Sequence, residues 1–555
     1  MKDLKPALFS SLKDYNGKQF VSDIVSGIIV AIIALPLSIA LAIASGVGPE
    51  KGLYTAIVAG FLISFFGGSK VQIAGPTAAF ATIVAGVVAA NGLEGLVLAT
   101  IMAGILLILM GIFKLGTLIK FIPYTITTGF TAGIAVTILV GQFKDFFGVK
   151  YSGEFAEKAP IETVEKLEAF FSNFSTVNWW AVLVGVISLA ILIIWPKIKY
   201  LNKIPGSLIA VLVGIAIVKF ANMNVNTIGD LYEVEGSLPP FDLPSMDLGL
   251  AKKVLPDAFT IAVLAAIESL LSCVVADGMI NSKHNSNAEL VAQGIGNVGS
   301  AFFGGIPATG AIARTAANIK SGGRTPIAGM VHAVVLLLIL VVLMPYASLI
   351  PMPVIAAILF SVAYNMSQWR PFVRIVRTAP KSDIFVLVLT FVLTVVFDLV
   401  VAIGVGMVLA CILFMKRMSD ETSVRTWEEK GNAADKKMDI PEGVSVFEIN
   451  GPLFFGATDR VAGLNIMEDK KCIIIRMGNV NAIDLTAINT LESVCRKLKD
   501  DGKVVLLSRV NPQPMKALEK AGIIDMLGRA HICSNIDTAL KLASEICQSD
   551  SENKD

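Results

Sequence analysis

Gly75-Pro76-Thr77-Ala78-Ala79 and Gly304-Gly305-Ile306-Pro307-Ala308-Thr309-Gly310-Ala311 interrupt otherwise apolar sequence in the same way, with glycine, proline and threonine beside small residues. Proline lacks an N–H group and glycine exposes the backbone, so neither stretch suits the middle of a continuous spanning helix. Each is a good place for a half-helix to begin. Two such breaks in corresponding halves of a chain indicate an inverted repeat whose broken helices form a binding site near the membrane centre. The pattern predicts a secondary transporter.

The repeat keeps a nearly constant spacing along the chain. Glycine and proline are common in membrane helices, so the spacing carries more weight than the residue types. Asp23 and Asp257, Pro76 and Pro307, and Pro123 and Pro351 are separated by 257 − 23 = 234, 307 − 76 = 231 and 351 − 123 = 228 residues. Three landmarks therefore support one internal duplication.

Composition places the chain among membrane proteins. Of its 555 residues, 54% are hydrophobic and 16% charged, and the mean hydropathy is +0.72. Successive apolar segments approach the ~20 residues that cross a bilayer. They predict an all-α polytopic membrane domain of fourteen transmembrane segments in a 7+7 inverted repeat, at about 24–45, 53–66, 76–90, 93–113, 124–142, 179–195, 204–220, 256–276, 289–303, 309–319, 325–344, 352–364, 383–397 and 399–415.

Charge predicts the orientation. Lysine and arginine are concentrated in the segments that face the cytoplasm if the N-terminus does, as the positive-inside rule requires. Residues 1–20 are polar and lysine-bearing, and the apolar run after them is too long for a cleavable signal peptide. We expect both termini in the cytoplasm.

The composition changes after Arg417, where short β-branched runs alternate with amphipathic helical patterns. This alternation predicts a small soluble α/β domain with a parallel or mixed sheet. The expected organisation is an N-terminal segment (1–20), a transport domain (21–417), a linker (418–440), the soluble domain (441–547) and a polar tail (548–555).

Five stretches, in this order, carry a resemblance to a known family: Ala34 to Ala42, Gly75 to Phe80, Ala266 to Leu271, Ala311 to Thr315 and Gly451 to Phe455. They resemble the SulP sulfate permease family, solute carrier family 26, and the C-terminal domain is similar to a STAS domain. Gly46 to Ala56 and Lys283 to Leu290 are similar to a bacterial branch that includes a C4-dicarboxylate carrier. The resemblance implies core and gate modules, coupled anion transport in a bacterial plasma (inner) membrane, and a homodimer. It also leaves room for a cytoplasmic regulator of the STAS domain.

The two breaks define the candidate anion site. Half-helices starting near Thr77 and Thr309 would direct their N-termini at each other, each with free N–H groups and roughly +0.5 of a charge. The predicted substrate-binding residues are Thr77, Ala78, Ala79, Thr309, Gly310, Ala311, Ala313 and Arg314.

Two ionisable residues lie deep in apolar sequence. Arg314, one turn into the second half-helix, is interpreted as the substrate's counter-charge. Glu268 lies in the middle of an apolar segment, where a charged carboxylate is costly, so it is interpreted as the carrier of a co-transported proton. A static Glu268–Arg314 pair is the structural alternative. Sodium-dependent members of the family use an Asp at the position of Glu268, and the longer Glu together with Ile312 favours protons over sodium.

Leu37 and Leu41 occupy positions where many sulfate and chloride members of the family carry Gln and Tyr. A more apolar pocket favours a substrate with a carbon skeleton, such as fumarate or succinate. Sulfate and bicarbonate stay open, because half-helix N–H groups suit any small oxyanion. A nucleobase permease of the same fold and an anion exchanger or channel-like relative are the competing functions.

Other activities find little support in the sequence. No nucleophile, base and orienting residue occur together, so an enzyme is not expected. The six cysteines lack metal-ligand spacing, and neither a cofactor, a metal nor a nucleic-acid partner is expected.

Three further features have plain interpretations. His332 is expected to be a satisfied core histidine, with a proton relay as the alternative. Thr486 matches the phosphorylated serine of STAS regulators, but its neighbours depart from that motif, and Asp484 is expected to cap a helix. A basic cluster reads as an inner-face membrane anchor, with binding of anionic membrane lipid as the alternative: Arg370, Arg374, Arg377 and Lys381.

Overall fold

The fold is described from a computed structural model that covers residues 4–157, 160–199, 204–234, 236–242, 247–397, 399–427, 440–463 and 469–552. The chain divides into two compact units, Met1–Met407 and Val408–Asp555. The division falls inside one helix, before the expected end of the transport domain at residue 417. Residues 428–439 of the expected linker lie outside the described residues.

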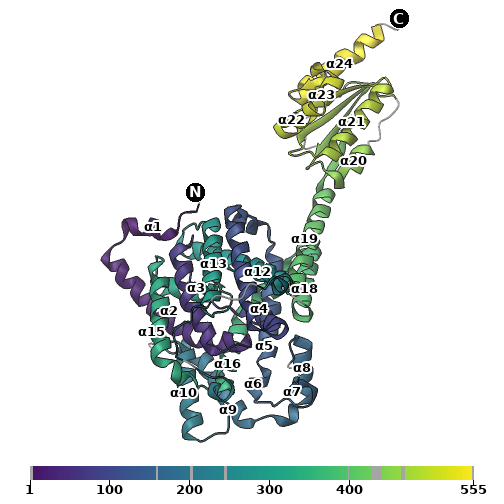
Figure 1. The fold of residues 1–555 in the computed structure, drawn as a ribbon. Coiled ribbons are helices and arrows are strands. Elements are labelled where there is room, and N and C mark those ends of the chain that lie inside the picture. The colour runs from purple at the N-terminus through teal and green to yellow at the C-terminus, as the bar shows by residue number, and fades with distance from the viewer. Residues whose placement is uncertain are drawn as a thin grey trace. The chain divides into compact units, whose positions relative to one another are not determined.

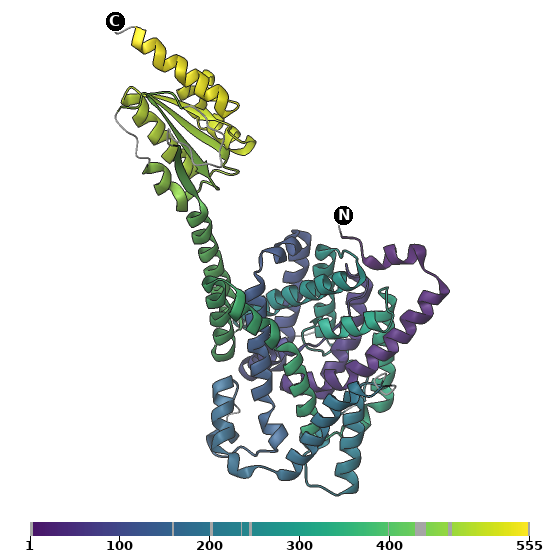
Figure 2. The same cartoon turned by 180° about the vertical axis from the view of Figure 1, so that it is seen from behind.

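The first unit is almost entirely helical (Figure 1; from behind, Figure 2). Its helices are α1 Ala7–Ser11, α2 Gly17–Ala44, α3 Pro49–Phe66, α4 Ala78–Ile112, α5 Tyr124–Gly141, α6 Phe143–Phe147, α7 Glu154–Glu157, α8 Thr163–Ser172, α9 Trp179–Ile194, α10 Gly206–Phe220, α11 Ile228–Leu231, α12 Leu248–Ile280, α13 Ser286–Phe302, α14 Ile312–Lys320, α15 Ile327–Ala347, α16 Met352–Met366, α17 Trp369–Thr378 and α18 Lys381–Val396, followed by α19 Leu399–Glu421, in which the unit ends.

Each of the fourteen apolar ranges coincides with a helix, and two of them share α4. Gly92 separates those two, because its φ of 68° and ψ of −174° are not helical. Seven spans among the described residues are long and apolar enough to cross a membrane by length and composition. The remaining apolar helices are shorter, as half-helices and tilted bundle members are.

Helix packing repeats itself between the two halves of this unit. α4 packs against α12 and α13, and α15, the counterpart of the second segment of α4, packs against α2 and α3. In the same way α5 packs against α18, and α16 against α9. Each half therefore places its helices against the other half, which is the arrangement an inverted repeat requires.

The two breaks meet as a short sheet in the middle of this bundle. β1 (Ala74–Gly75) pairs antiparallel with β2 (Thr309–Gly310), with Ala74 opposite Gly310 and Gly75 opposite Thr309. α4 begins directly after β1, and α14 begins directly after β2. The strand pair thus fixes the starting points of both half-helices.

The second unit contains a five-stranded mixed sheet of order β3-β4-β5-β6-β7. β3 pairs antiparallel with β4, and the other neighbours are parallel. The strands are β3 Ser423–Trp427, β4 Val444–Asn450, β5 Cys472–Asn479, β6 Val504–Ser508 and β7 Ile532–Cys533, and the helices are α20 Thr458–Ala462, α21 Leu485–Asp500, α22 Pro512–Lys520, α23 Ile523–Leu527 and α24 Ile536–Glu552. α21, α22 and α23 cover one face and α24 the other (Figure 1). β3 lies inside the range expected to be a linker.

Candidate functional site

A cavity of about 230 Å³ lies where the two half-helices begin, and we call it the central cavity. Six of the predicted site residues line it together with Glu268: Thr77, Ala78, Gly310, Ala311, Ala313 and Arg314. Helices α2, α5, α12 and α16 supply the remaining wall. Residues from both repeats therefore converge on one space.

Two predicted residues do not line the central cavity. Thr309 is fully buried, and its hydroxyl lies 2.6 Å from Ser269 Oγ and donates to Ala265 O at 3.1 Å. This places Thr309 as a brace between β2 and α12. Ala79 instead lines a second cavity. The half-helix α14 begins at Ile312 rather than near Thr309, because Thr309 and Gly310 are held in strand pairing with β1.

Neither half-helix is capped by a described side chain. Thr77 is the N-cap residue of α4 and Ala311 that of α14, and neither makes a side-chain cap hydrogen bond. The N–H groups of a helix's first turn have no partner inside the helix. Both helices therefore present free N–H groups and the positive ends of their dipoles to the region of the cavity.

The guanidinium of Arg314 is buried at the cavity wall. Nη2 donates to Pro76 O at 3.0 Å and lies 3.4 Å from Ser38 Oγ. Nε and Nη1 have no hydrogen-bond partner in the described part of the chain, although the residue is only 1% exposed. A buried donor without a partner costs about 1–3 kcal/mol, and more when it is charged. Arg314 thus has donors available for a ligand.

Gly75 makes room for this guanidinium. A Cβ atom at Gly75 would lie 2.3 Å from Arg314 Nη1 and 3.5 Å from the Cα atom of Ala56. The first distance is shorter than a real contact, so a side chain at residue 75 would force the end of the Arg314 side chain to move from its position beside β1. Gly75 of the first repeat thereby influences where the Arg314 guanidinium of the second repeat lies.

Glu268 faces the same cavity from α12. Thr77 Oγ1 donates to Glu268 Oε2 at 3.0 Å. Among the described residues no salt bridge joins Glu268 to Arg314. Glu268 and Arg314, both in the second half, therefore contact different residues of the first half, Thr77 and Pro76, and the static pair considered above is not formed.

Sequence reasoning did not identify several polar residues of the wall. Thr127 and Thr131 on α5, and Asn365 and Gln368 at the end of α16, also line the central cavity. They occur in unremarkable helical sequence, and only the packing of α5 and α16 around α4 brings them to the site. The wall is otherwise apolar, and Leu37 and Leu41 belong to it as expected.

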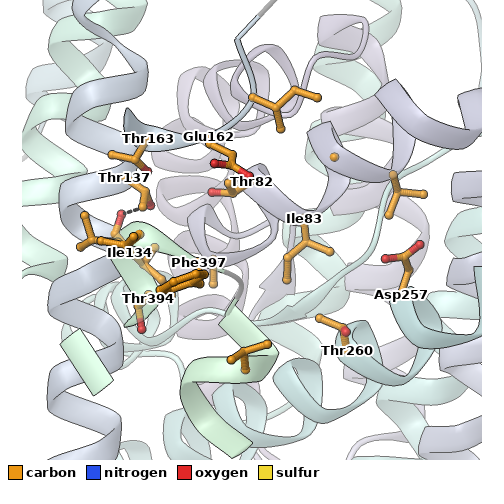
Figure 3. Close-up of a pocket in the computed structure, with 17 residues that line it drawn as sticks. Thr82, Ile83, Ile134, Thr137, Glu162, Thr163, Asp257, Thr260, Thr394 and Phe397 are labelled. Carbon is orange, nitrogen blue, oxygen red and sulfur yellow. Dashed lines mark hydrogen bonds between the residues drawn. The ribbon is translucent and has the colours of Figure 1, made fainter. Parts of the chain in front are cut away.

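The second cavity, of about 410 Å³, lies beyond the start of α4 (Figure 3). Thr131 of α5 and Glu268 of α12 line the central cavity. Thr137 of α5 and Thr260 of α12 line the second cavity. Helices rise 1.5 Å per residue, so the two cavities are displaced along the helix axes, with the N-terminus of α4 between them. No basic residue is found among the described residues that line the second cavity. Its labelled side chains that carry a hydroxyl or a carboxylate are Thr82, Thr137, Glu162, Thr163, Asp257, Thr260 and Thr394.

Two histidines have contrasting surroundings. His332 is fully buried, and neither ring nitrogen has a hydrogen-bond partner among the described residues. It is therefore not the satisfied core histidine that was expected. His284 lies in the short segment between α12 and α13, with Nδ1 2.7 Å from Asp277 Oδ2 and Nε2 2.9 Å from Ser286 Oγ. Neither histidine lines the central cavity.

Family comparison agrees with this architecture. The model of the sulfate permease family matches residues 20–390, about two thirds of the chain. The chain belongs to this family. The model of the STAS domain matches residues 435–539, which covers most of the second unit. The chain is therefore a multi-pass membrane transporter with a C-terminal STAS domain, and not an enzyme.

Curated relatives extend along nearly the whole chain. "Putative sulfate transporter YvdB" of Bacillus subtilis is 41% identical over 538 residues, 95% of this chain and 98% of the relative. "Bicarbonate transporter BicA" of Synechocystis is 31% identical over 513 residues, 89% of either chain. Their names refer to sulfate and bicarbonate, and the expected likeness to a C4-dicarboxylate branch gains no support from them.

Solved structures share the fold. The murine Slc26a9 anion transporter, solved in the inward-facing state, superimposes with a TM-score of 0.88 at 18% identity, covering 98% of this chain and 94% of that one. The transmembrane domain of a cyanobacterial bicarbonate transporter, BicA, has a TM-score of 0.63 at 30% identity, covering 72% of this chain and 98% of that one. At 18% identity the first likeness concerns the fold alone.

Proposed function

We propose that this chain carries a small oxyanion across the membrane by proton-coupled secondary transport, with the central cavity as the binding site. The observation that carries the proposal is Arg314, a buried guanidinium with two unpartnered nitrogens at a cavity where two uncapped helices begin. These three groups are all donors or positive ends. An anion would satisfy all of them at once, whereas a neutral nucleobase would leave the positive charge uncompensated.

The two cavities support an alternating-access cycle. With the N-terminus in the cytoplasm, the central cavity faces the inner side and the second cavity the outer side. The start of α4, from Thr77 to Ala79, lies between them. The second cavity has acidic and hydroxyl groups but no described cation, so it suits the passage of an anion better than its binding. Movement of α5 against α4 would open one side and close the other.

Glu268 is the proposed proton carrier. Its charged form is costly at this depth, and a hydroxyl of the other repeat already contacts one of its oxygens. A proton on Glu268 would allow the loaded site to cross the membrane with less exposed charge. No cluster of three or more His, Cys, Asp or Glu side chains that could hold a metal ion occurs among the described residues.

The candidate substrates are bicarbonate, sulfate and C4-dicarboxylates. The names of the relatives favour the first two. The apolar wall contributed by Leu37 and Leu41 favours a substrate with a carbon skeleton. All three classes carry oxygen atoms that match N–H and guanidinium donors.

Purified protein in proteoliposomes tests the proposal. Uptake of radiolabelled sulfate, bicarbonate, succinate, fumarate and uracil is measured with and without an inward proton gradient. We expect saturable uptake of one oxyanion class that increases with the gradient, and no uracil uptake. Uracil uptake, or gradient-independent flux that does not saturate, would contradict proton-coupled anion transport.

A further inference from the structure

The short helix α17, Trp369–Thr378, does not take part in the proposed transport site, and it has three distinct faces. One face packs inward: α17 lies against α5, and the Phe372 ring is 5.5 Å from the Phe391 ring of α18. No residue of α17 is fully buried. The other two faces are therefore open on the described chain.

One open face is apolar. Trp369, Val373 and Val376 follow one another at helical spacing and are 47%, 36% and 40% exposed. The next stripe around the helix, one residue further along, is basic and exposed, and consists of Arg370, Arg374 and Arg377. A shift of one residue is 100° of rotation, so the two stripes lie side by side along the helix.

The basic stripe has no anionic partner within the described chain. No described carboxylate forms a salt bridge with any of its three arginines. The Arg370 guanidinium does lie 5.3 Å from the centroid of the Trp369 ring, in a cation–π interaction. Three neighbouring cations repel each other unless an external anion joins them.

The position of α17 indicates which anion that is. The helix connects α16 to α18, two apolar helices of the membrane domain, so it lies where the chain turns at the membrane boundary. An exposed apolar stripe is unfavourable in water but fits the acyl region just below the headgroups. A basic stripe beside it fits the headgroup phosphates, and Arg forms forked hydrogen bonds with phosphate. A soluble phosphate would satisfy only the basic stripe.

We propose that α17 is an interfacial helix that binds anionic phospholipid, with headgroup phosphates on Arg370, Arg374 and Arg377 and acyl chains on Trp369, Val373 and Val376. Lys381, exposed at the first turn of α18, extends the basic stripe. Lipid held here would also steady the end of α16, because Met366 and Gln368 immediately precede α17.

Lipid titration of the purified full-length protein tests this inference without any transport measurement. Delipidated protein in detergent is titrated with phosphatidylglycerol or phosphatidylcholine, and bound lipid is counted by native mass spectrometry. The triple variant Arg370→Gln/Arg374→Gln/Arg377→Gln should bind phosphatidylglycerol about a hundredfold more weakly, since each basic residue at an anionic surface contributes about 1 kcal/mol. The matched control Lys13→Gln/Lys18→Gln/Lys70→Gln removes the same charge from three exposed, scattered positions and should bind as wild type does.

Further arms separate the outcomes. The triple Arg→Lys variant should retain most of the binding, because charge is kept. Millimolar inorganic phosphate should not displace the lipid. If phosphate displaces it, or if the control loses as much as the α17 variant, the inference fails. If the triple variant does not fold, Arg374→Gln alone should still weaken binding about fivefold, and unchanged binding in that variant overturns the proposal.

Discussion

The half-helices α4 and α14 begin in the same way but contribute different chemistry. Each follows a two-residue strand, and neither is capped by a described side chain. The first turn of α14 carries Arg314, a permanent charge, whereas the start of α4 carries Thr77, which contacts the ionisable Glu268. The duplicated backbone therefore creates the anion-attracting geometry twice. Both ionisable side chains come from the second half, the fixed charge on α14 and the titratable one on α12, and the first half contributes the Thr77 hydroxyl that contacts Glu268.

In the STAS domain, by contrast, the N-terminus of helix α21 is capped by a side chain. Asp484 caps α21 by accepting from Ala487 N at 2.9 Å, and its other oxygen accepts from Phe455 N at 3.0 Å. A carboxylate thus occupies the position that an anion would take. The Asp484 cap that was expected from sequence is therefore present. The N-terminus of α21 is occupied by a carboxylate, whereas those of α4 and α14 are not capped by a described side chain.

Removing the fixed charge should have the largest effect. Arg314→Ala should weaken anion binding on the order of a hundredfold, because charge-assisted hydrogen bonds are lost inside a low-dielectric site. Binding is measured by isothermal titration or scintillation proximity with purified protein. Lys320→Ala removes an exposed charge from the same helix and should bind normally. Normal affinity in Arg314→Ala would disprove the assignment of the counter-charge.

Removing the titratable charge should separate binding from coupling. Glu268→Gln imitates the protonated acid, so exchange of labelled for unlabelled anion should persist while net uptake driven by an inward proton gradient is lost. Glu94→Gln changes an exposed acid of α4 and should retain both. If Glu268→Gln still accumulates anion with the gradient, the proton travels elsewhere, and His332 becomes the residue to test.

Crowding the contact between the halves should have an intermediate effect. In Gly75→Ala the new Cβ would displace Arg314 Nη1, so we expect about tenfold weaker anion binding from a protein that still folds. Gly86→Ala is the matched control, because a Cβ there meets nothing within 4 Å. Equal affinities in the two variants would show that the position of the guanidinium is not set by β1.

Deletion of the chain after Met418 should have the smallest effect on the site. Both half-helices lie in the first unit, so truncation should lower the rate or the expression level and leave the order of preferred anions unchanged. Competition assays with sulfate, bicarbonate and succinate measure that order. A reordered preference would mean that the STAS domain takes part in selecting the substrate.

The expected helices and breaks were recognisable because their signals are local. Apolar length, proline and glycine located all fourteen helical ranges, and the strand-helix alternation of the C-terminal domain located β4, β5 and β6. β3 and β7 were missed. β3 lies within a polar stretch and is held as a strand by antiparallel pairing with β4, and β7 is only two residues long.

The sequence by itself determined the membrane class, the duplicated breaks, the α/β tail and the two costly ionisable residues, since each is encoded in a short run of side chains. Tertiary structure alone decided which of these residues meet. Thr77 and Glu268 are 191 residues apart, and Arg314 and Pro76 are 238 apart, yet both pairs are hydrogen-bonded at one cavity. It also moved Thr309 and Ala79 away from that cavity and brought Thr127, Thr131 and Gln368 to it. Periodicity specifies a helix, but the contacts of each face depend on packing between distant segments of the chain.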